Sequence, residues 1–314
     1  MKELAIATYG LTKRFEGYIA VNEIDLQIKA GEVYGLIGPN GAGKTTLMRM
    51  LATAEEPTKG EIYLHGDRLL RDDSNPVLKQ RIGYLPDDFP LYDDLTVWDY
   101  LDYFARLYLL KEPKRSLRIH EVLELVQLEN KHKSIISTLS RGMKQRLSLA
   151  RTIIHEPILL LLDEPVSGLD PIARQQFRQI IKVLQEAGMT ILISSHVLSD
   201  LAELCTSVGI MELGFLVEST SLAELYQRLS HQQITLATLG KMEILQQKLN
   251  QNPLVNTWEM IADNRFKIDF KGGESDCAEL LRSLVLADIP LTEFHQSQED
   301  LESIFLKLGH QQTS

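Results

Sequence analysis

The stretch Gly38-Pro39-Asn40-Gly41-Ala42-Gly43-Lys44-Thr45 decides how this sequence is interpreted, because it fits the phosphate-loop pattern GxxxxGK[ST]. The pattern counts only between a strand and a helix, and both are expected here: residues 33–37 are an apolar run, and residues 46–51 have helical character. Glycines let the backbone curl until several N–H groups point at one anion, and the following helix N-terminus adds partial positive charge. The alternative is a glycine-rich turn without a ligand. The complete match in this context makes that alternative the weaker one.

Two side chains of the loop have separate predicted tasks. We expect Lys44 to bridge the β- and γ-phosphates of a nucleotide and the Thr45 hydroxyl to bind Mg²⁺. The predicted nucleotide-binding residues of this segment are Gly38, Pro39, Asn40, Gly41, Ala42, Gly43, Lys44, Thr45 and Thr46.

An acidic pair follows the most apolar run of the sequence. Residues 158–162 are all isoleucine or leucine, and Asp163, Glu164 and Pro165 come directly after them. A buried strand would place both carboxylates at its C-terminal end, where ligands bind in α/β folds. We expect Asp163 to hold Mg²⁺, directly or through water, and Glu164 to act as the general base toward the attacking water. An ordinary acidic strand end is the alternative, which the phosphate loop makes weaker.

Strands and helices are expected to alternate over the first two thirds of the chain. The strand expected at 4–9 alternates Leu4, Ile6 and Thr8 with Ala5, Ala7 and Tyr9, and the strand expected at 21–28 alternates apolar and polar residues. This predicts an antiparallel sheet with one solvated face. Later strands are short apolar runs separated by helices, which predicts a mostly parallel sheet covered on both faces. These strands are expected at 33–37, 82–85, 158–162 and 190–194, and helices at 96–114, 116–128 and 173–187. Residues 61–64, with the turn His65-Gly66, predict a further strand.

The composition changes near residue 226, where glutamine and asparagine become frequent. We expect a strand at 233–238, a helix at 241–250, strands at 255–262 and 265–270, a helix at 275–287, a strand at 291–295 and a helix at 299–308. Up to residue 295 this order is βαββαβ, which is typical of ferredoxin-like α+β domains. We therefore divide the chain into a nucleotide-binding domain at 1–225 and an accessory, regulatory or dimerising domain at 226–314.

Length and composition agree with two globular domains. The chain has 314 residues, 44% of them hydrophobic, and a formal net charge of −10. No apolar run approaches the ~20 residues that span a bilayer. Residues 1–7 hold one lysine and few apolar side chains, so we do not expect a secretory signal there. The acidic balance argues against nucleic-acid binding. The two cysteines, Cys205 and Cys277, lack a CxxC partner, so we expect buried thiols in the cytoplasm rather than a disulfide or metal ligands.

Three further motifs complete an ordered set around the phosphate loop and the acidic pair. They are Leu139-Ser140-Arg141-Gly142-Met143, Ser167-Gly168-Leu169-Asp170 and Ser194-Ser195-His196. This set, over residues 3–220, resembles the ATP-binding cassette (ABC) of ABC transporters. The resemblance implies an α/β phosphate-loop domain with a parallel core sheet, an antiparallel β-subdomain and a helical subdomain at about 88–155. It also implies that ATP is bound and hydrolysed to ADP and phosphate.

The resemblance assigns roles to the segment at 139–143, which reads LSGGQ in the family pattern. Ser140 and Gly142 are kept, whereas Arg141 and Met143 replace glycine and glutamine. In this family the signature of one subunit closes over the ATP of another. A head-to-tail homodimer, or a heterodimer of cassettes, is therefore implied. Ser140 and Gly142 would contact a γ-phosphate, and Asp170 would cross the interface.

The resemblance also assigns roles to an aromatic, an acidic and a histidine residue. His196 resembles the switch histidine, which holds the γ-phosphate and the attacking water. Phe15 lies where the family places an aromatic ring on adenine, and Tyr18 is the alternative. Asp87 stands where the family usually has glutamine; its oxygen can bind Mg²⁺, although an ionised carboxylate cannot donate a hydrogen bond. The predicted metal ligands are Thr45, Asp87 and Asp163.

Two segments point to a branch of the family. Residues 298–308 resemble the ending of ATPase subunits of multidrug, antibiotic-resistance and polysaccharide-type exporters, and residues 82–92 are similar to the same branch. This implies the ATPase subunit of a two-component exporter, peripheral on the cytoplasmic face of the membrane, with its transmembrane permease on a separate chain. A soluble cassette ATPase not coupled to transport is one alternative, which a single phosphate loop and the lack of sustained heptads disfavour. A non-hydrolysing ATP switch is the other, which Arg141, Met143 and Asp87 keep open.

Overall fold

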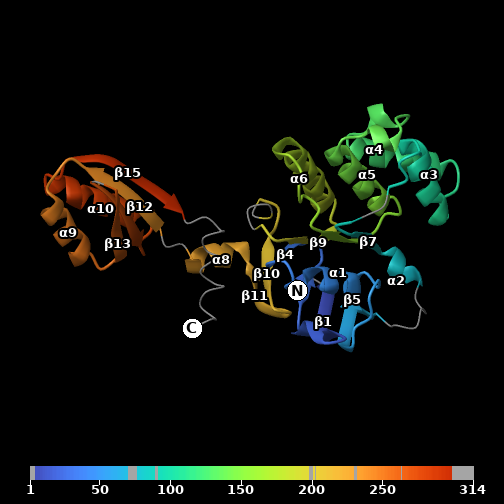
Figure 1. Cartoon of the computed structure of the whole chain (residues 1–314), viewed down its shortest axis with the longest axis horizontal. Helices are drawn as coiled ribbons and strands as arrows, with labels where there is room; N and C mark the ends of the chain where they lie inside the picture. Colours follow the sequence, from blue (N-terminus) through green and yellow to red (C-terminus); the bar gives the residue numbers. More distant parts are fainter. Residues whose placement is uncertain are drawn as a thin grey trace. The chain divides into compact units, whose positions relative to one another are not determined.

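The computed structural model describes residues 4–69, 76–88, 91–197, 201, 203–229, 232–262 and 264–298. The chain divides into two compact units, Met1–Leu222 and Ala223–Ser314 (Figure 1), so the division along the chain falls close to the boundary expected at residue 225. The helix predicted at 299–308 lies outside the described residues.

A six-stranded sheet forms the centre of the first unit, in the order β11-β10-β4-β9-β8-β7. Its strands are β4 (Val33–Ile37), β7 (Ile82–Leu85), β8 (Leu159–Asp163), β9 (Thr190–Ser195), β10 (Ser207–Glu212) and β11 (Phe215–Ser221). All pairs are parallel except β10 with β11 at one edge. Every residue of β4, β8 and β9 is buried, which confirms a parallel sheet covered on both faces. Figure 1 shows helix α6 (Pro171–Glu186) on one side of this sheet and helix α1 (Lys44–Leu51) on the other.

A second, antiparallel sheet is built from β1 (Leu4–Phe15), β2 (Tyr18–Ile24), β3 (Gln27–Lys29), β5 (Lys59–Leu64) and β6 (Asp67–Arg68). The single strand expected at 21–28 is divided in two. Glu23 adopts a positive φ of 50°, and the Asp25 carboxylate then accepts a hydrogen bond from the Gly10 N–H at 2.6 Å. The expectation of one solvated face is wrong at the start of β1, because residues 5–8 are all buried.

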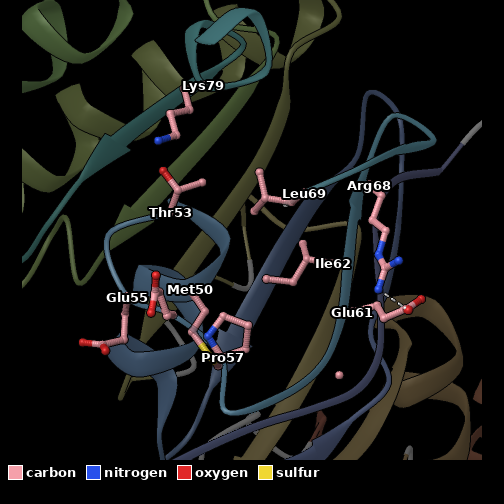
Figure 2. A pocket seen from close by; sticks show the side chains of 11 residues that line it. Met50, Thr53, Glu55, Pro57, Glu61, Ile62, Arg68, Leu69 and Lys79 are labelled. Atoms are coloured by element: carbon pink, nitrogen blue, oxygen red, sulfur yellow. Dashed lines mark hydrogen bonds and ion pairs between the residues drawn. The ribbon is translucent and has the colours of Figure 1, made fainter. Parts of the chain in front are cut away.

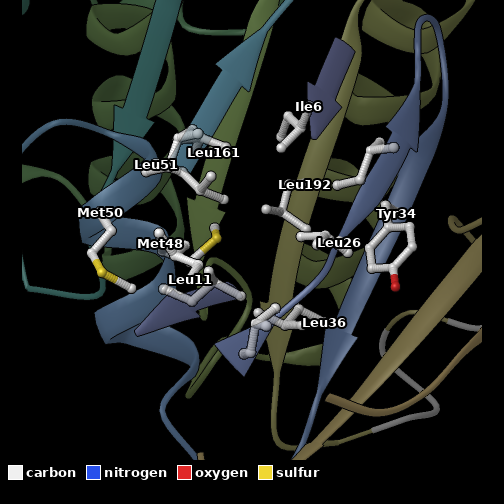
Figure 3. Close-up of a cluster of buried hydrophobic side chains, with 14 of the residues drawn as sticks. Ile6, Leu11, Leu26, Tyr34, Leu36, Met48, Met50, Leu51, Leu161 and Leu192 are labelled. Atoms are coloured by element: carbon white, nitrogen blue, oxygen red, sulfur yellow. The ribbon is translucent and has the colours of Figure 1, made fainter. Parts of the chain in front are cut away.

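One hydrophobic core joins the two sheets and helix α1 (Figure 3). Its fully buried members include Ile6, Leu11, Leu26, Leu36, Met48, Leu51, Leu161 and Leu192. Because strand β4 and helix α1 both contribute to this core, the loop between them is attached to two packed elements.

The segment between β7 and β8 is mainly helical. It contains α3 (Val97–Leu107), α4 (Lys114–Leu125) and α5 (Arg141–Ile153), with 3₁₀ turns at Glu129–Lys131 and Ile136–Thr138. The Thr96 hydroxyl caps α3 by accepting a hydrogen bond from the Asp99 N–H at 3.1 Å. The helix expected at 96–114 is too long. It ends at Leu107 because Leu109 takes a left-handed conformation, with φ 60°. A short helix, α2 (Pro76–Gln80), precedes β7.

The second unit contains a four-stranded antiparallel sheet in the order β13-β14-β12-β15. Its elements are α8 (Leu222–Leu229), β12 (Gln232–Thr238), α9 (Met242–Gln251), β13 (Val255–Ala262), β14 (Arg265–Phe270), α10 (Glu274–Leu286) and β15 (Leu291–Gln298). From β12 onward the order is the expected βαββαβ, while the ferredoxin-like assignment stays a prediction. A separate core includes Ile234, Leu236, Phe266, Ile268, Phe270 and Leu284. Cys205 and Cys277 are both buried, as expected for the two thiols.

Candidate functional site

The phosphate loop connects β4 to α1, and two of its glycines are required by close backbone neighbours. A Cβ on Gly38 would lie 2.2 Å from the Met211 carbonyl oxygen. A Cβ on Gly43 would lie 2.2 Å from the Ala20 carbonyl oxygen, and Gly43 also has a φ of 101°. Strands β2 and β10 therefore hold the loop from both ends, at distances that only glycine allows.

Lys44 lies inside this loop with only 5% of its surface exposed. Its Nζ donates to the carbonyl oxygens of Gly38 at 2.7 Å and Pro39 at 3.2 Å, and it lies 3.5 Å from Glu164 Oε1. The ammonium group is thus oriented by three oxygens beneath the curled backbone. A buried, oriented cation in a glycine-rich loop is suited to bind the phosphates of a nucleotide.

Asp163 is completely buried at the end of β8. The Ser194 hydroxyl donates to its Oδ1 at 2.5 Å, whereas Oδ2 has no hydrogen-bond partner among the described residues. Burial raises the pKa of the Asp163 carboxyl, and the side chains of Ser194 and Thr45 act in the opposite direction. A buried acceptor without a partner is costly, and a hard cation would satisfy it, so the residues present fit Mg²⁺.

Glu164 connects Lys44 with the histidine of the last motif. Its Oε2 lies 2.8 Å from His196 Nδ1, and its other carboxylate oxygen faces Lys44. Glu164 has a φ of 49°, a left-handed conformation that is unfavourable for residues other than glycine. The Glu164 N–H donates to the Ser194 hydroxyl at 3.0 Å, which holds this turn in place. The structure therefore brings the predicted general base, the phosphate-loop lysine and the switch histidine together.

Asp87 follows β7 and belongs to the same neighbourhood. Burial raises the pKa of its carboxyl, and the negative charge of Glu164 adds to this, while Arg141 and His196 act in the opposite direction. A cavity of about 280 Å³ lies here, lined by Asp87, Asp88, Leu91, Asp93, Arg141, Lys144 and Gln145. Among the described residues there is no cluster of three His, Cys, Asp or Glu side chains that could hold a metal ion alone. A cation at this site would therefore also need hydroxyl, water or phosphate oxygens.

The residues of the signature segment and of the following loop lie at two helix N-termini. The Ser140 hydroxyl caps α5 by accepting from the Met143 N–H at 3.3 Å, and the Asp170 carboxylate caps α6 by accepting from the Ala173 N–H at 2.9 Å. Gly142 is buried, and a Cβ there would lie 2.7 Å from the Ala173 Cβ. The two N-termini are thus in close contact within one chain. The predicted contacts of Ser140, Gly142 and Asp170 with ATP in another subunit stay predictions.

The two aromatic candidates for the adenine site form one pair. Phe15 and Tyr18 face each other across the β1–β2 turn with ring centroids 5.5 Å apart and an interplanar angle of 29°. Tyr18 is 60% exposed, and Lys13 Nζ lies 4.8 Å from the Phe15 ring centroid. The structure places both rings at the turn that joins β1 to β2.

Ser194 is the residue of this site to which the sequence assigned no separate role. Its one hydroxyl contacts both Asp163 and Glu164. The available signal was a polar residue at the end of the apolar run at 191–193, inside a strand expected to be buried.

A second cavity, of about 270 Å³, lies beside β5 and β6 (Figure 2). It includes the ion pair of Arg68 with Glu61, and Met50, Ile62 and Leu69 form its apolar part. None of the predicted site residues lines it, so we assign it no part in nucleotide chemistry.

Together, the fold and the site define a phosphate-loop α/β protein equipped to bind a nucleoside triphosphate. Residues 21–167 match the family described as ABC transporter. The chain is 35% identical to the uncharacterized ABC transporter ATP-binding protein YcbN of Bacillus subtilis, over 96% of each chain. It is 34% identical to the bacitracin transport ATP-binding protein BcrA of Enterococcus faecalis, over 98% of this chain and 96% of BcrA. The chain therefore belongs to the ABC transporter family as an ATP-binding subunit, and it is an ATPase.

A solved structure agrees with the fold. Cbio1 of Clostridium perfringens, part of the ABC transporter complex cbiONQ, has a TM-score of 0.67 at 24% identity, over 80% of this chain and 97% of that chain. In the described part of our chain, no helix combines the length and the hydropathy required to span a bilayer.

Proposed function

We propose that this chain is the ATP-hydrolysing motor of a two-component exporter, driving substrate through a transmembrane permease on a separate chain. Two features support this. BcrA, which is similar over nearly its whole length, is named for bacitracin transport. The segment at 298–308 resembles the ending of exporter ATPases, and its residues 299–308 lie outside the described residues. On this proposal the chain is peripheral on the cytoplasmic face of the membrane.

The position of Glu164 between Lys44 and His196 carries the proposal of hydrolysis. Lys44 binds the β- and γ-phosphates. Glu164 accepts a proton from the attacking water while the oxygen of that water bonds to the γ-phosphorus. The bond from that phosphorus to the β-phosphate oxygen breaks, which releases ADP and phosphate. His196 orients the Glu164 carboxylate from the opposite side, at 2.8 Å.

The metal site has a specific donor set. We propose that Thr45, Asp87 and Asp163 hold Mg²⁺, which supplies positive charge against the phosphate oxygens. The unpartnered Oδ2 of Asp163 supports this assignment. Phe15, with Tyr18 stacked against it, is proposed to bind adenine.

A head-to-tail dimer, of this chain or with another cassette, is also part of the proposal. Ser140 and Asp170 cap two helices whose N-termini are in contact, and such termini favour anions. On this proposal Ser140 and Gly142 contact the γ-phosphate of ATP in the other subunit, while Asp170 crosses the interface.

Exposed apolar side chains in the helical segment support a protein partner there. Tyr92 and Tyr103 are each 46% exposed, Leu107 is 59% exposed and Leu109 is 78% exposed. Apolar groups gathered on one region of a soluble domain commonly mark a protein interface. We propose that the permease contacts this region.

Glu164→Gln tests the proposed hydrolysis. The amide keeps the size of the side chain but cannot accept the proton, so turnover should fall at least about 100-fold while ATP binding is retained. Glu186→Gln, at the exposed end of α6, is the matched control and should keep normal turnover. Unchanged turnover in Glu164→Gln would refute the role of Glu164. A wild-type chain that binds ATP without hydrolysing it would instead favour the alternative of a non-hydrolysing ATP switch. Purification of the chain from membranes tests the proposed permease. An integral membrane protein should be recovered together with the chain.

A further inference from the structure

Arg141 makes a contact that the family pattern, with glycine in this place, does not provide. It is the first residue of α5. Its Nη2 donates to the Ser167 carbonyl oxygen at 3.1 Å. The guanidinium also covers Gly168, where a Cβ would lie 2.6 Å from Nη2 and 2.7 Å from Cζ. Arg141 and Gly168 are therefore complementary in size, because any side chain at Gly168 would displace the guanidinium.

The Ser167 peptide links this contact to Glu164. The Ser167 N–H donates to the Glu164 carbonyl oxygen at 3.1 Å. Two hydrogen bonds in series thus connect the Arg141 guanidinium with the backbone of Glu164. On the other side of the same residue, the Glu164 N–H is held by the Ser194 hydroxyl.

The backbone of Glu164 needs such support. A residue with a φ of 49° persists only where its surroundings fix it, because the left-handed region is unfavourable for glutamate. The direction of the carboxylate toward Lys44 and His196 depends on this conformation. A small rotation at Glu164 would move its carboxylate away from both partners.

We propose that Arg141 is a positioning residue for ATP hydrolysis. By holding the Ser167–Gly168 turn, it fixes the conformation of Glu164 from within the same chain. It thereby couples the N-terminus of α5 to the residue that activates water. A displacement of α5 reaches Glu164 through these two hydrogen bonds. The inference rests on the proposed role of Glu164 as general base.

Arg141→Ala in the full chain tests the proposal by steady-state ATP turnover and thermal unfolding. We expect kcat to fall about 3- to 10-fold, which is the effect of losing one hydrogen bond, while KM for ATP stays the same. Arg141→Lys keeps one donor and should recover part of kcat. Arg106→Ala is the matched control, since Arg106 is 60% exposed and pairs with Asp102 on α3; it should leave kcat unchanged. A merely structural role would lower the unfolding temperature instead.

A double-mutant cycle with Gly168→Ala tests the contact itself. In the wild-type background the new Cβ displaces the guanidinium and strains a residue with a φ of 66°. In the Arg141→Ala background only the strain remains, so Gly168→Ala should lower kcat less than it does alone. Additive effects of the two changes on kcat would overturn the proposal.

Glu164→Gln separates the possible failures. If that variant keeps normal turnover, the role of Glu164 fails, and the positioning role fails with it. If it loses turnover and Arg141→Ala keeps a normal kcat, only the positioning role is overturned. A raised KM for ATP at unchanged kcat in Arg141→Ala would make Arg141 a nucleotide contact, and would overturn the proposal as well.

Discussion

Replacing Ser194 with alanine should disturb both acidic residues of the site at once. The hydroxyl donates to Asp163 Oδ1 at 2.5 Å and accepts from the Glu164 N–H at 3.0 Å, and the residue has no exposed surface. A hydrogen bond to a charged group contributes about 1.5–3 kcal/mol and a neutral one about 0.5–1.5 kcal/mol. Ser194→Ala should therefore lower the free energy of unfolding by about 2–4.5 kcal/mol.

Thermal unfolding and ATP turnover both measure this effect. A domain of this size loses about 2–4 °C per kcal/mol, so the transition of the first unit should fall by about 4–18 °C. Below that temperature, kcat should fall about 10- to 100-fold, because Glu164 loses one of the contacts that hold it in place.

Ser195→Ala is the matched control on the neighbouring residue. Ser195 is 2% exposed and also makes two hydrogen bonds, but both join its hydroxyl to Val197, each at 3.0 Å. This variant should lose about 1–3 kcal/mol, because both bonds are neutral, and keep its turnover within about twofold. Equal unfolding temperatures and equal turnover in the two variants would refute the reasoning, since the bridge to Asp163 and Glu164 would then contribute nothing.

Two further predictions concern pH. Burial raises the pKa of Asp163 in the folded protein above its ordinary value of 3.8. The folded protein therefore loses stability as the pH rises from 3.8 through this raised pKa, because the unfolded chain releases the proton first. In the presence of a chelator and at neutral pH, the free energy of unfolding of Asp163→Asn should therefore be about 0.5–2 kcal/mol higher than that of the wild type. The difference should vanish in acid. The added stabilisation by MgATP should be lost in the same variant. Burial lowers the pKa of His155 below 6.5, so stability is lost as the pH falls below that value, because the unfolded chain takes up the proton first. His155→Phe, which keeps a ring stacked on Tyr108, should flatten the dependence of the unfolding temperature on pH over this interval.

Much of the fold was predictable because its signals are local. The apolar run at 33–37, the glycine-rich loop and the helix after it follow one another in sequence, and the structure keeps that order with β4 ending at Ile37. The same holds for the alternation of elements after residue 232. The end of α3 was missed because leucine gives no signal for the left-handed conformation that Leu109 adopts.

The burial of β1 was missed for a different reason. Alternation of large and small or polar side chains predicts which residues share a face of a strand, but not whether another layer covers the opposite face. Ala5 and Ala7 are covered by neighbouring elements of the first unit, although their small side chains gave no sign of it.

The sequence by itself determined the residue types of the site: a lysine in a phosphate loop, two carboxylates after a buried strand and a histidine after another. Only the tertiary structure decided which atoms meet. Strands β8 and β9 lie side by side in parallel, in the register that sets Asp163 against Ser194. This register places one hydroxyl between two acidic residues, and the contact of α5 with α6 places Arg141 on Ser167. Steric preferences and patterning act over a few residues and can be read along the chain, whereas strand register and helix contact depend on packing between segments far apart in sequence.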